Sequence, residues 1–299
     1  ENCRIIDTYQ EADAVLYHGP DFHGYNQHIT SKQIAVFWVL ESPVNYRPNR
    51  INWTMTYRLD SDILLPYGVI RKAEGPIQVD YEQLWNEKKA STVWLISNCG
   101  HNNARIQLAN ALQQGGLNID IFGRCGKPTP NNCDGTSKQS DKCVAELFRP
   151  YKFAISFENS LCPNYITEKF YELLEDRYTV PIVMQRSITR KNLQAPNNSF
   201  IAVDDFKNLA DLVNYIHTVE NSKEEYLKYQ SWREHYTVKS AYFSIEETGF
   251  CALCKKLMAN NFTTKYYENM SSWHSPNTCE QPQDGFAKKY LDLVTALPL

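Results

Sequence analysis

The chain has 299 residues, of which 42% are hydrophobic, and this is enough for two domains with separate cores. The formal net charge is only -3, so the chain lacks the basic excess that is typical of nucleic-acid-binding proteins. No apolar run reaches the ~18 residues that a membrane-spanning helix needs, and no signal peptide is visible.

Cysteines and glycosylation sequons indicate an oxidising compartment. The chain contains nine cysteines, and Asn-x-Ser/Thr sequons begin at Asn52, Asn197, Asn261 and Asn269. Each sequon is a weak signal by itself, but the two features together favour the secretory pathway over the cytosol. Because the number of cysteines is odd, we expect at least one thiol to stay free or to pair outside the chain.

Apolar runs near the start of the chain predict a small α/β domain. Residues 14–17 and 34–40 have the length and composition of buried strands. Residues 71–91 are charged and weakly patterned, so we expect the interdomain linker there. We therefore place the first domain at residues 1–88.

From residue 92 onward the pattern changes to alternating strands and helices. We expect strands at 92–97, 118–123, 151–157, 179–184 and 200–203, and helices at 103–114, from about 167, and at 209–219. This alternation predicts a parallel, doubly wound sheet for residues 89–247. Residues 248–299 have little periodicity, and we expect a cysteine-containing extension that packs back on the body, with partial disorder as the alternative.

Residues 151–183 read as a strand, a polar turn, a helix and a second strand, which is the βαβ crossover of a parallel sheet. Ligands of such sheets bind beyond the carboxyl ends of the strands. The polar side chains expected there are Glu158, Asn159, Tyr165, Glu168 and Lys169. A helix that begins at Thr167 also points free N–H groups toward this edge, so the stretch is expected to bind an anion.

Two cations are predicted at helix amino ends in the same sheet. Arg105 lies near the start of the helix at 103–114, and Lys169 lies near the start of the next helix. The helix dipole disfavours a cation there unless an anion sits between the helix end and the side chain. The residues alone leave two readings open, which are a diphosphate clamp and a pair of solvated surface residues.

Several short motifs resemble those of the α1,3-fucosyltransferases, glycosyltransferase family 10. The motifs are LESP at 40–43, TYRLDSD at 56–62, PYG at 66–68, SNC at 97–99, FENS at 157–160, YITEK at 165–169 and FCALC at 250–254. Together, the motifs extend over most of the chain, and their order and spacing match those of the family. The SNCG and GRCG segments look most like the subgroup that fucosylates the chitobiose core of N-glycans. The resemblance implies a GT-B fold, with two Rossmann-like domains facing a central crevice.

The resemblance also implies roles for single residues. In the family, the arginine and lysine that match Arg105 and Lys169 bind the donor pyrophosphate. The other positions that match donor-binding residues are Glu168, Asn159, Tyr165, Tyr67, Ser97 and Leu95. For the acceptor, His18, His23 and Trp38 are candidate sugar contacts, with ordinary packing as the equal alternative.

Glu41 is the candidate general base. Pro43 ends the apolar strand and leaves the carboxylate at its carboxyl end. From the residues alone a strand-terminating surface acid is the better reading, whereas LESP resembles the motif that holds the catalytic glutamate of the family. The implied reaction is a single inverting displacement, in which Glu41 deprotonates the acceptor and Arg105 and Lys169 neutralise the departing GDP.

No protein-bound metal or tightly bound cofactor is expected, and the resemblance implies GDP-fucose as the donor substrate. Asp60 and Asp62 form an Asp-x-Asp pair, but we read them as structural, because local turn and ion-pair bonding can satisfy them. Stimulation by a divalent ion is left open.

The tail motif also bears on the disulfides. Cys251 and Cys254 have half of a zinc-site spacing, but no second pair follows, so disulfides are the better reading. The family resemblance pairs this motif with the start of the catalytic region, which favours Cys3 with Cys254. Cys99 and Cys125 follow successive strand ends and could meet.

Three alternatives remain to the core-type enzyme. They are a Lewis-type α1,3-fucosyltransferase acting on N-acetyllactosamine, a GT-B transferase for another nucleotide sugar, and a secreted carbohydrate-binding protein that kept the fold without turnover. The resemblance further implies a location in the Golgi lumen, through a membrane anchor and stem upstream of Glu1. Nothing in the sequence indicates the oligomeric state.

Overall fold

The computed structural model describes residues 3–21, 30, 32–44, 50–100, 104–130, 133, 142–186, 195–240, 249–259, 266–280 and 285–295. The candidate acceptor residue His23 and the sequon at Asn261 lie outside these residues. In the part of the chain that is described, no helix is both long enough and apolar enough to span a bilayer.

The chain divides into two compact units, each built from several parts of the sequence. The first unit comprises Glu1–Gly68, Cys162–Tyr165 and Ala241–Cys279, and the second comprises Val69–Leu161, Ile166–Ser240 and Glu280–Leu299. The units separate after Gly68, earlier in the chain than the domain boundary expected from the sequence. The short segment Cys162–Tyr165 belongs to the first unit, although its neighbours on both sides belong to the second.

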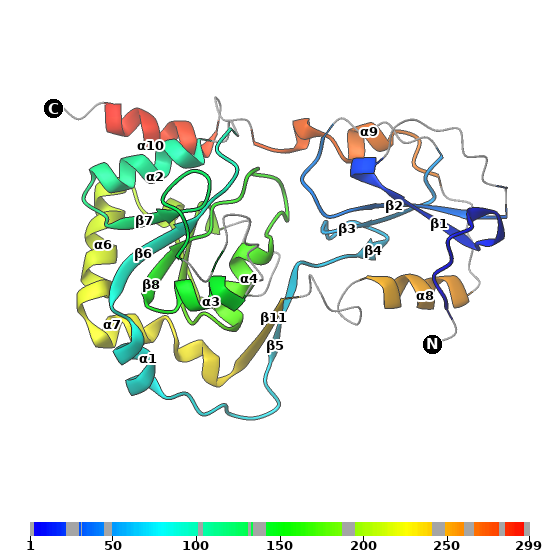
Figure 1. Ribbon diagram of the computed structural model, residues 1–299. Coiled ribbons are helices and arrows are strands. Elements are labelled where there is room, and N and C mark those ends of the chain that lie inside the picture. Colours follow the sequence, from blue (N-terminus) through cyan, green and yellow to red (C-terminus); the bar gives the residue numbers. More distant parts are fainter. Residues whose placement is uncertain are drawn as a thin grey trace. The chain divides into compact units, whose positions relative to one another are not determined.

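The first unit contains a four-stranded parallel sheet, and the early apolar runs at 14–17 and 34–40 form its first two strands. Its strands, in spatial order, are β1 (Ala14–His18), β2 (Ile34–Val39), β3 (Trp53–Thr56) and β4 (Ile63–Leu64). Side chains of β2 alternate between two hydrophobic clusters, with Val36 on the face that packs against α8 (Phe250–Met258) and Phe37 on the other face. Figure 1 shows α8 on one face of this sheet and α9 (Met270–Trp273) on the other.

The second unit contains a five-stranded parallel sheet. Its spatial order is β10 (Ile201–Ala202), β9 (Val180–Val183), β8 (Tyr151–Ile155), β6 (Ala90–Leu95) and β7 (Ile119–Phe122). This confirms the doubly wound sheet predicted for the region and the βαβ crossover in residues 151–183.

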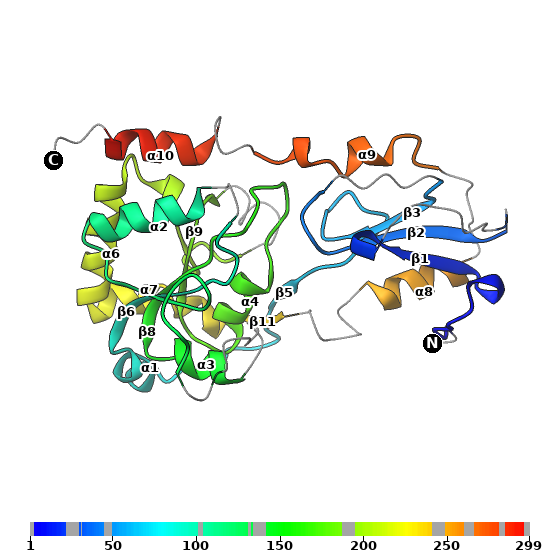
Figure 2. The same cartoon turned by 45° about the horizontal axis from the view of Figure 1, so that its top comes forward.

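Helices cover both faces of the larger sheet. One hydrophobic cluster joins it to α2 (Arg105–Gln114), α6 (Leu209–Asn221), α7 (Lys223–Lys228) and α10 (Phe286–Thr295), and another joins it to α3 (Lys142–Phe148) and α4 (Glu168–Glu175). The two sets lie on opposite sides of the strands in Figure 2. Glycines follow α2 at its end, and Gly116 adopts φ +102°, a conformation that residues with a side chain rarely adopt.

The expected linker is ordered and forms part of the second unit. Residues 81–87 form helix α1 (Tyr81–Glu87), which begins because the Asp80 carboxylate accepts a hydrogen bond from the amide of Gln83. Strand β5 (Gly68–Lys72) pairs with β11 (Tyr236–Ser240) in a two-stranded sheet. A 3-10 turn at Ser231–Glu234 leads into β11.

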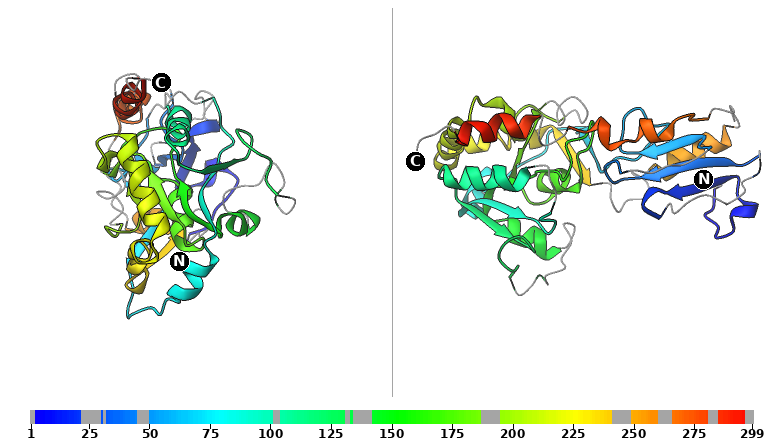
Figure 3. Two further views of the ribbon diagram at one scale, coloured as in Figure 1. Left: turned by 90° about the vertical axis from the view of Figure 1, so that its left-hand side faces the viewer. Right: turned by 90° about the horizontal axis from the view of Figure 1, so that it is seen from above.

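The C-terminal extension is shared between the units. Helix α8 packs on the smaller sheet, whereas α10 lies beside α2 in the larger unit (Figure 3). Four disulfides join Cys3 to Cys254, Cys99 to Cys125, Cys133 to Cys143 and Cys162 to Cys279. The first two are the pairings that the sequence suggested. Cys251, which we also expected in a disulfide, lies outside these four, because Cys3 takes up its CxxC neighbour Cys254.

Burial changes the interpretation of one sequon. Asn52 is only 4% exposed, and its side-chain oxygen accepts a hydrogen bond from the amide of Ala35 at 2.8 Å. Glycosylation needs an accessible amide, so the burial of Asn52 disfavours a glycan at this sequon in the folded protein. Asn197 and Asn269 are exposed and remain candidates.

Candidate active site

The topology of the larger sheet selects one place for a ligand. After β6 the chain adds β7 on one flank, and it then returns to add β8, β9 and β10 on the other. The winding reverses between β6 and β8, and open α/β sheets bind ligands beyond the carboxyl ends of the strands at such a point. The loops that begin after Leu95 and Ile155 are therefore the candidate donor-binding edge.

Arg105 connects these two loops. It is the first residue of α2, and its guanidinium donates to the carbonyl of Asn98 at 2.7 Å and to the carbonyl of Phe157 at 3.3 Å. The residue is 3% exposed, so the reading of Arg105 as a solvated surface cation is wrong. A buried guanidinium that is fixed by two carbonyls places a full positive charge at the switch point.

Lys169 adds a second cation at the start of α4. Its ammonium donates to the hydroxyl of Thr167 at 2.8 Å and to Glu168 at 3.0 Å, and it lies 3.6 Å from a carboxylate oxygen of Glu158. Burial lowers the pKa of Lys169, but the two carboxylates outweigh this effect and hold the pKa above its usual value. The lysine is therefore charged at neutral pH, and Arg105 is close enough to repel it.

Glu158 organises the amino end of α4. Its carboxylate accepts hydrogen bonds from the amide of Thr167 at 2.7 Å and from the hydroxyl of Thr167 at 2.9 Å. Burial raises the pKa of the Glu158 carboxyl, against the lowering effect of Lys169. The sequence placed Glu158 in the polar cluster without a role. The spacing of nine residues between Glu158 and Thr167 carries no signal for this long-range cap.

The other expected donor residues differ in their surroundings. Asn159 follows Glu158, and its side-chain oxygen is buried without a hydrogen-bond partner among the described residues. Ser97 is exposed at the end of β6. Leu95, by contrast, is 9% exposed and packs in the core cluster with Val93 and Phe148, so its side chain serves packing.

A second group of polar side chains lies in the first unit, at the carboxyl end of β2. Glu41 follows this strand, is exposed, and accepts a hydrogen bond from the hydroxyl of Tyr165 at 3.1 Å. Tyr67 donates its hydroxyl to the carbonyl of Leu40 at 2.7 Å. The rings of Tyr57 and Tyr67 lie 4.9 Å and 6.1 Å from the ring of Tyr165. Two residues expected at the donor, Tyr67 and Tyr165, thus surround the candidate base.

The candidate acceptor contacts are partly exposed. The rings of His18 and Trp38 lie 4.8 Å apart with their planes tilted, near the ends of their strands, and Trp38 also contacts the ring of Phe250 edge-on. Both residues therefore take part in packing, and their partial exposure also leaves surface for a ligand.

The Asp-x-Asp pair is held by local bonds. Asp60 forms a two-pronged ion pair with Arg58, and this lowers the pKa of Asp60, chiefly through the side-chain hydrogen bond. Asp62 accepts hydrogen bonds from the amide of Thr54 and from the hydroxyl of Tyr267. These contacts agree with the structural reading of both aspartates. Among the described residues, no group of three or more His, Cys, Asp or Glu side chains could hold a metal ion.

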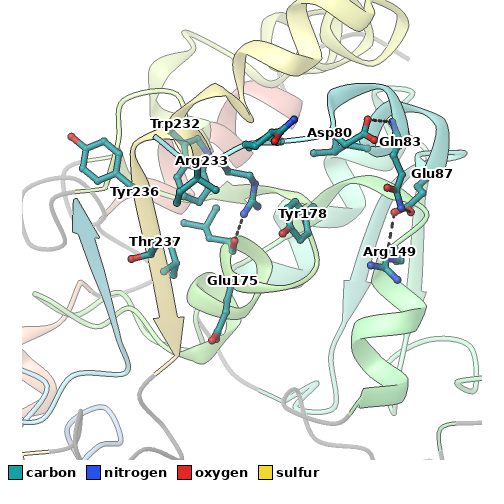
Figure 4. Close-up of a pocket in the computed structure, with 16 residues that line it drawn as sticks. Asp80, Gln83, Glu87, Arg149, Glu175, Tyr178, Trp232, Arg233, Tyr236 and Thr237 are labelled. Atoms are coloured by element: carbon teal, nitrogen blue, oxygen red, sulfur yellow. Dashed lines mark hydrogen bonds and ion pairs between the residues drawn. The ribbon is translucent and has the colours of Figure 1, made fainter. Parts of the chain in front are cut away.

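A cavity of about 360 Å³ in the second unit lies at the opposite edge of the sheet. Its lining includes Glu87, Arg149 and Tyr178, which lie two or three residues before β6, β8 and β9 (Figure 4). Arg233 also lines it, lies over the rings of Tyr178 and Trp232, and donates to the last turn of α4 through the carbonyl of Leu174. Because it lies at the amino ends of the strands, the cavity is separate from the donor-binding edge.

Comparison with known proteins identifies the family. Residues 85–273 match the family profile "Glycosyltransferase family 10 (fucosyltransferase) C-term", and residues 1–68 match "Fucosyltransferase, N-terminal". The chain belongs to glycosyltransferase family 10. This makes it a fucosyltransferase, as the motifs suggested.

Individual family 10 proteins resemble the chain over most of its length. It is 39% identical to "Alpha-(1,3)-fucosyltransferase fut-6" of Caenorhabditis elegans over 97% of this chain and 76% of that protein. It is 32% identical to "Glycoprotein 3-alpha-L-fucosyltransferase A" of Drosophila melanogaster over 93% of this chain and 56% of that protein. It is 33% identical to human "4-galactosyl-N-acetylglucosaminide 3-alpha-L-fucosyltransferase FUT6" over 86% of this chain and 71% of that protein.

The fold agrees with the family assignment. A crystal structure of an α1,3-fucosyltransferase with GDP-fucose superimposes with a TM-score of 0.54 and 18% sequence identity, over 85% of this chain and 80% of that one. Together with the parallel sheets, this confirms the expected α/β fold of GT-B type.

Proposed function

We propose that the protein transfers L-fucose from GDP-fucose to O3 of an N-acetylglucosamine in an N-glycan, with inversion at the anomeric carbon. The observation that carries the proposal is the pair of cations at the switch point. Arg105 is buried and fixed by two carbonyls, and Lys169 is held in its charged form by two carboxylates. The departing GDP develops negative charge on its diphosphate, and preorganised cations stabilise that charge best.

Glu41 is the proposed general base. A carboxylate can take the proton from the attacking hydroxyl, and the exposure of Glu41 leaves it accessible to an acceptor. The proposed donor contacts are Arg105, Lys169, Glu168, Asn159 and Ser97. The reaction needs no protein-bound metal in this scheme, because the two cations neutralise the diphosphate.

The chitobiose core of N-glycans is the preferred acceptor in this proposal. The names of the relatives include a glycoprotein 3-α-L-fucosyltransferase and 4-galactosyl-N-acetylglucosaminide 3-α-L-fucosyltransferases, at similar identities. N-acetyllactosamine is therefore the second candidate acceptor. The four disulfides support an oxidising compartment, and we place the enzyme in the Golgi lumen as part of this proposal.

The variant Glu41→Gln tests the role of the base. It keeps the size of the side chain and removes the carboxylate, so we expect fucose transfer to fall by at least about 100-fold. Binding of GDP-fucose, measured by calorimetry, should stay within about twofold, because none of the proposed donor contacts changes. Transfer at near the parent rate would show that Glu41 is not the base.

A further inference from the structure

We propose that the disulfide between Cys162 and Cys279 holds the loop before α4 in the conformation that binds the donor. This loop, residues 158–167, is called the donor loop below; it contains Asn159 and leads directly to Lys169. Cys162 is then a positioning residue for the donor substrate. The inference rests on the proposed function, from which it takes the two donor contacts.

Hydrogen bonds join the two ends of the donor loop. The carboxylate of Glu158 accepts one from the amide of Thr167 at 2.7 Å and one from its hydroxyl at 2.9 Å. These bonds close the loop at its base. A loop that is closed only at its base can still change conformation in residues 159–166, so the middle needs an attachment of its own.

The C-terminal extension supplies this attachment. Cys162 is 1% exposed and is bonded to Cys279, which lies 117 residues further along the chain. Beside the disulfide, the carbonyl of Leu161 accepts a hydrogen bond from the amide of Glu280 at 2.8 Å, and the two residues form an antiparallel β-bridge. Two successive residues of the donor loop are thus fixed to two successive residues of the extension.

The extension is itself attached to the edge of the larger sheet where the donor is proposed to bind. The side-chain amide of Gln185 donates to the carboxylate of Glu280 at 2.7 Å. Gln185 follows β9 by two residues and therefore lies at the carboxyl ends of the strands. The middle of the donor loop is in this way held in place relative to the sheet that carries the donor site.

The expected consequence is a higher affinity for the donor. A loop that is mobile before binding must be ordered when the ligand binds, and the conformational freedom that it loses lowers the affinity. An attachment that orders the loop beforehand removes this cost. A disulfide that only stabilised the fold would, by contrast, leave the affinity of the folded protein unchanged.

Replacing both cysteines, Cys162→Ala with Cys279→Ala, tests the inference. Alanine is preferred to serine because Cys162 is buried, and a buried hydroxyl would need a partner. At a temperature where the variant is folded, we expect the Kd for GDP-fucose to rise about 10-fold in calorimetry. The KM for GDP-fucose should rise by the same factor, with kcat within about threefold of the parent.

Hydrogen exchange gives a second measurement that does not depend on the donor. Without ligand, amides of the peptide 157–170 should exchange faster in the double variant than in the parent. An unchanged Kd for GDP-fucose or unchanged exchange of this peptide would overturn the inference. Failure of the proposed function is seen separately, because the parent would then bind no GDP-fucose.

Cys3→Ala with Cys254→Ala is the matched control. This disulfide closes 251 residues of sequence, so its loss should destabilise the protein at least as much as loss of the disulfide at Cys162. It should nevertheless leave the Kd for GDP-fucose and the exchange of the peptide 157–170 unchanged. An equal rise in Kd in both double variants would show a general effect of lost stability and would refute the inference.

Gln185→Leu is a milder variant that keeps every disulfide. It removes the amide that bonds to Glu280, so we expect faster exchange of the peptide 157–170 and a Kd for GDP-fucose about two- to fivefold higher. If the Cys162 double variant does not fold, Gln185→Leu decides the question. Unchanged exchange and an unchanged Kd would then overturn the inference.

Discussion

Arg105 is the residue on which the donor side of the account depends most. Its guanidinium makes two hydrogen bonds in different directions, to carbonyls that follow two different strands. A lysine keeps the charge but carries it on a single ammonium, so it cannot reproduce this bridge. We expect Arg105→Lys to weaken GDP binding about 10- to 100-fold in calorimetry, which corresponds to ~1.4–2.8 kcal/mol.

Arg149→Lys is the control for this variant. Arg149 is more than half exposed and pairs with Glu87 at the opposite edge of the same sheet. Exposed ion pairs contribute little, so this change should leave GDP affinity as it is. Equal GDP affinity in Arg105→Lys and the parent would remove Arg105 from the donor site.

Single residues also show which features could not be predicted from the sequence. Arg105 and Lys169 could be placed at helix ends from periodicity alone, but the burial of Arg105 depends on carbonyls of Asn98 and Phe157, which no side-chain pattern encodes. The same limit applies to Asn52, which fits a glycosylation sequon but is buried against Ala35. Local patterns report side-chain chemistry, whereas these outcomes depend on the packing of distant segments.

Helix α4 is the element that positions Lys169. Thr167 precedes it, is 1% exposed, and links Glu158 to Lys169 through its hydroxyl. Thr167→Val keeps the shape and removes the hydroxyl, which leaves polar atoms of Glu158 without this partner. We expect the free energy of unfolding to fall by about 1–3 kcal/mol in denaturant titrations, together with weaker GDP binding.

Two further variants make this test specific. Thr167→Ser restores the hydroxyl and should recover most of the stability and the GDP affinity. Thr218→Val removes an exposed hydroxyl that bonds within α6, and should change stability by at most about 0.5 kcal/mol. If the Thr167→Val protein is as stable as the parent, the hydrogen bonds that join Glu158, Thr167 and Lys169 do not stabilise the fold.

The regular strands and helices could be predicted from the sequence, whereas elements that depend on partners distant in sequence could not. The alternation of apolar runs predicted the strands and helices of the larger sheet, because buried parallel strands and amphipathic helices have distinct periods. The pairing of β5 with β11 joins segments more than 150 residues apart, and neither has a strong pattern. The assignment of Cys162–Tyr165 to the first unit likewise depends on partners that are distant in sequence.

At the level of the whole molecule, we propose separate functions for the two units. All proposed donor contacts lie in the second unit, whereas the disulfide between Cys3 and Cys254 closes the first unit across 251 residues of sequence. In the loop-entropy picture, Cys3→Ser with Cys254→Ser should cost about 5 kcal/mol of stability, since the loop is long. GDP affinity at low temperature should not change.

The Cys133–Cys143 disulfide is the comparator, because it closes only 10 residues of sequence. Its removal by Cys133→Ser with Cys143→Ser should cost less, about 3 kcal/mol. Thermal unfolding of both double variants shows which of the two disulfides stabilises the protein more. If removal of the Cys3–Cys254 disulfide abolished GDP binding at temperatures where the protein stays folded, the separation of functions would be wrong.

The proposed activity is tested most directly by the release of GDP from GDP-fucose by the unmodified protein, with and without an N-glycan acceptor. We expect release that depends on the acceptor, with one GDP for each fucose found at O3 of N-acetylglucosamine, and with the chitobiose core preferred over N-acetyllactosamine. Binding of GDP-fucose without GDP release on any N-glycan would contradict it, and would favour a carbohydrate-binding protein on the same fold.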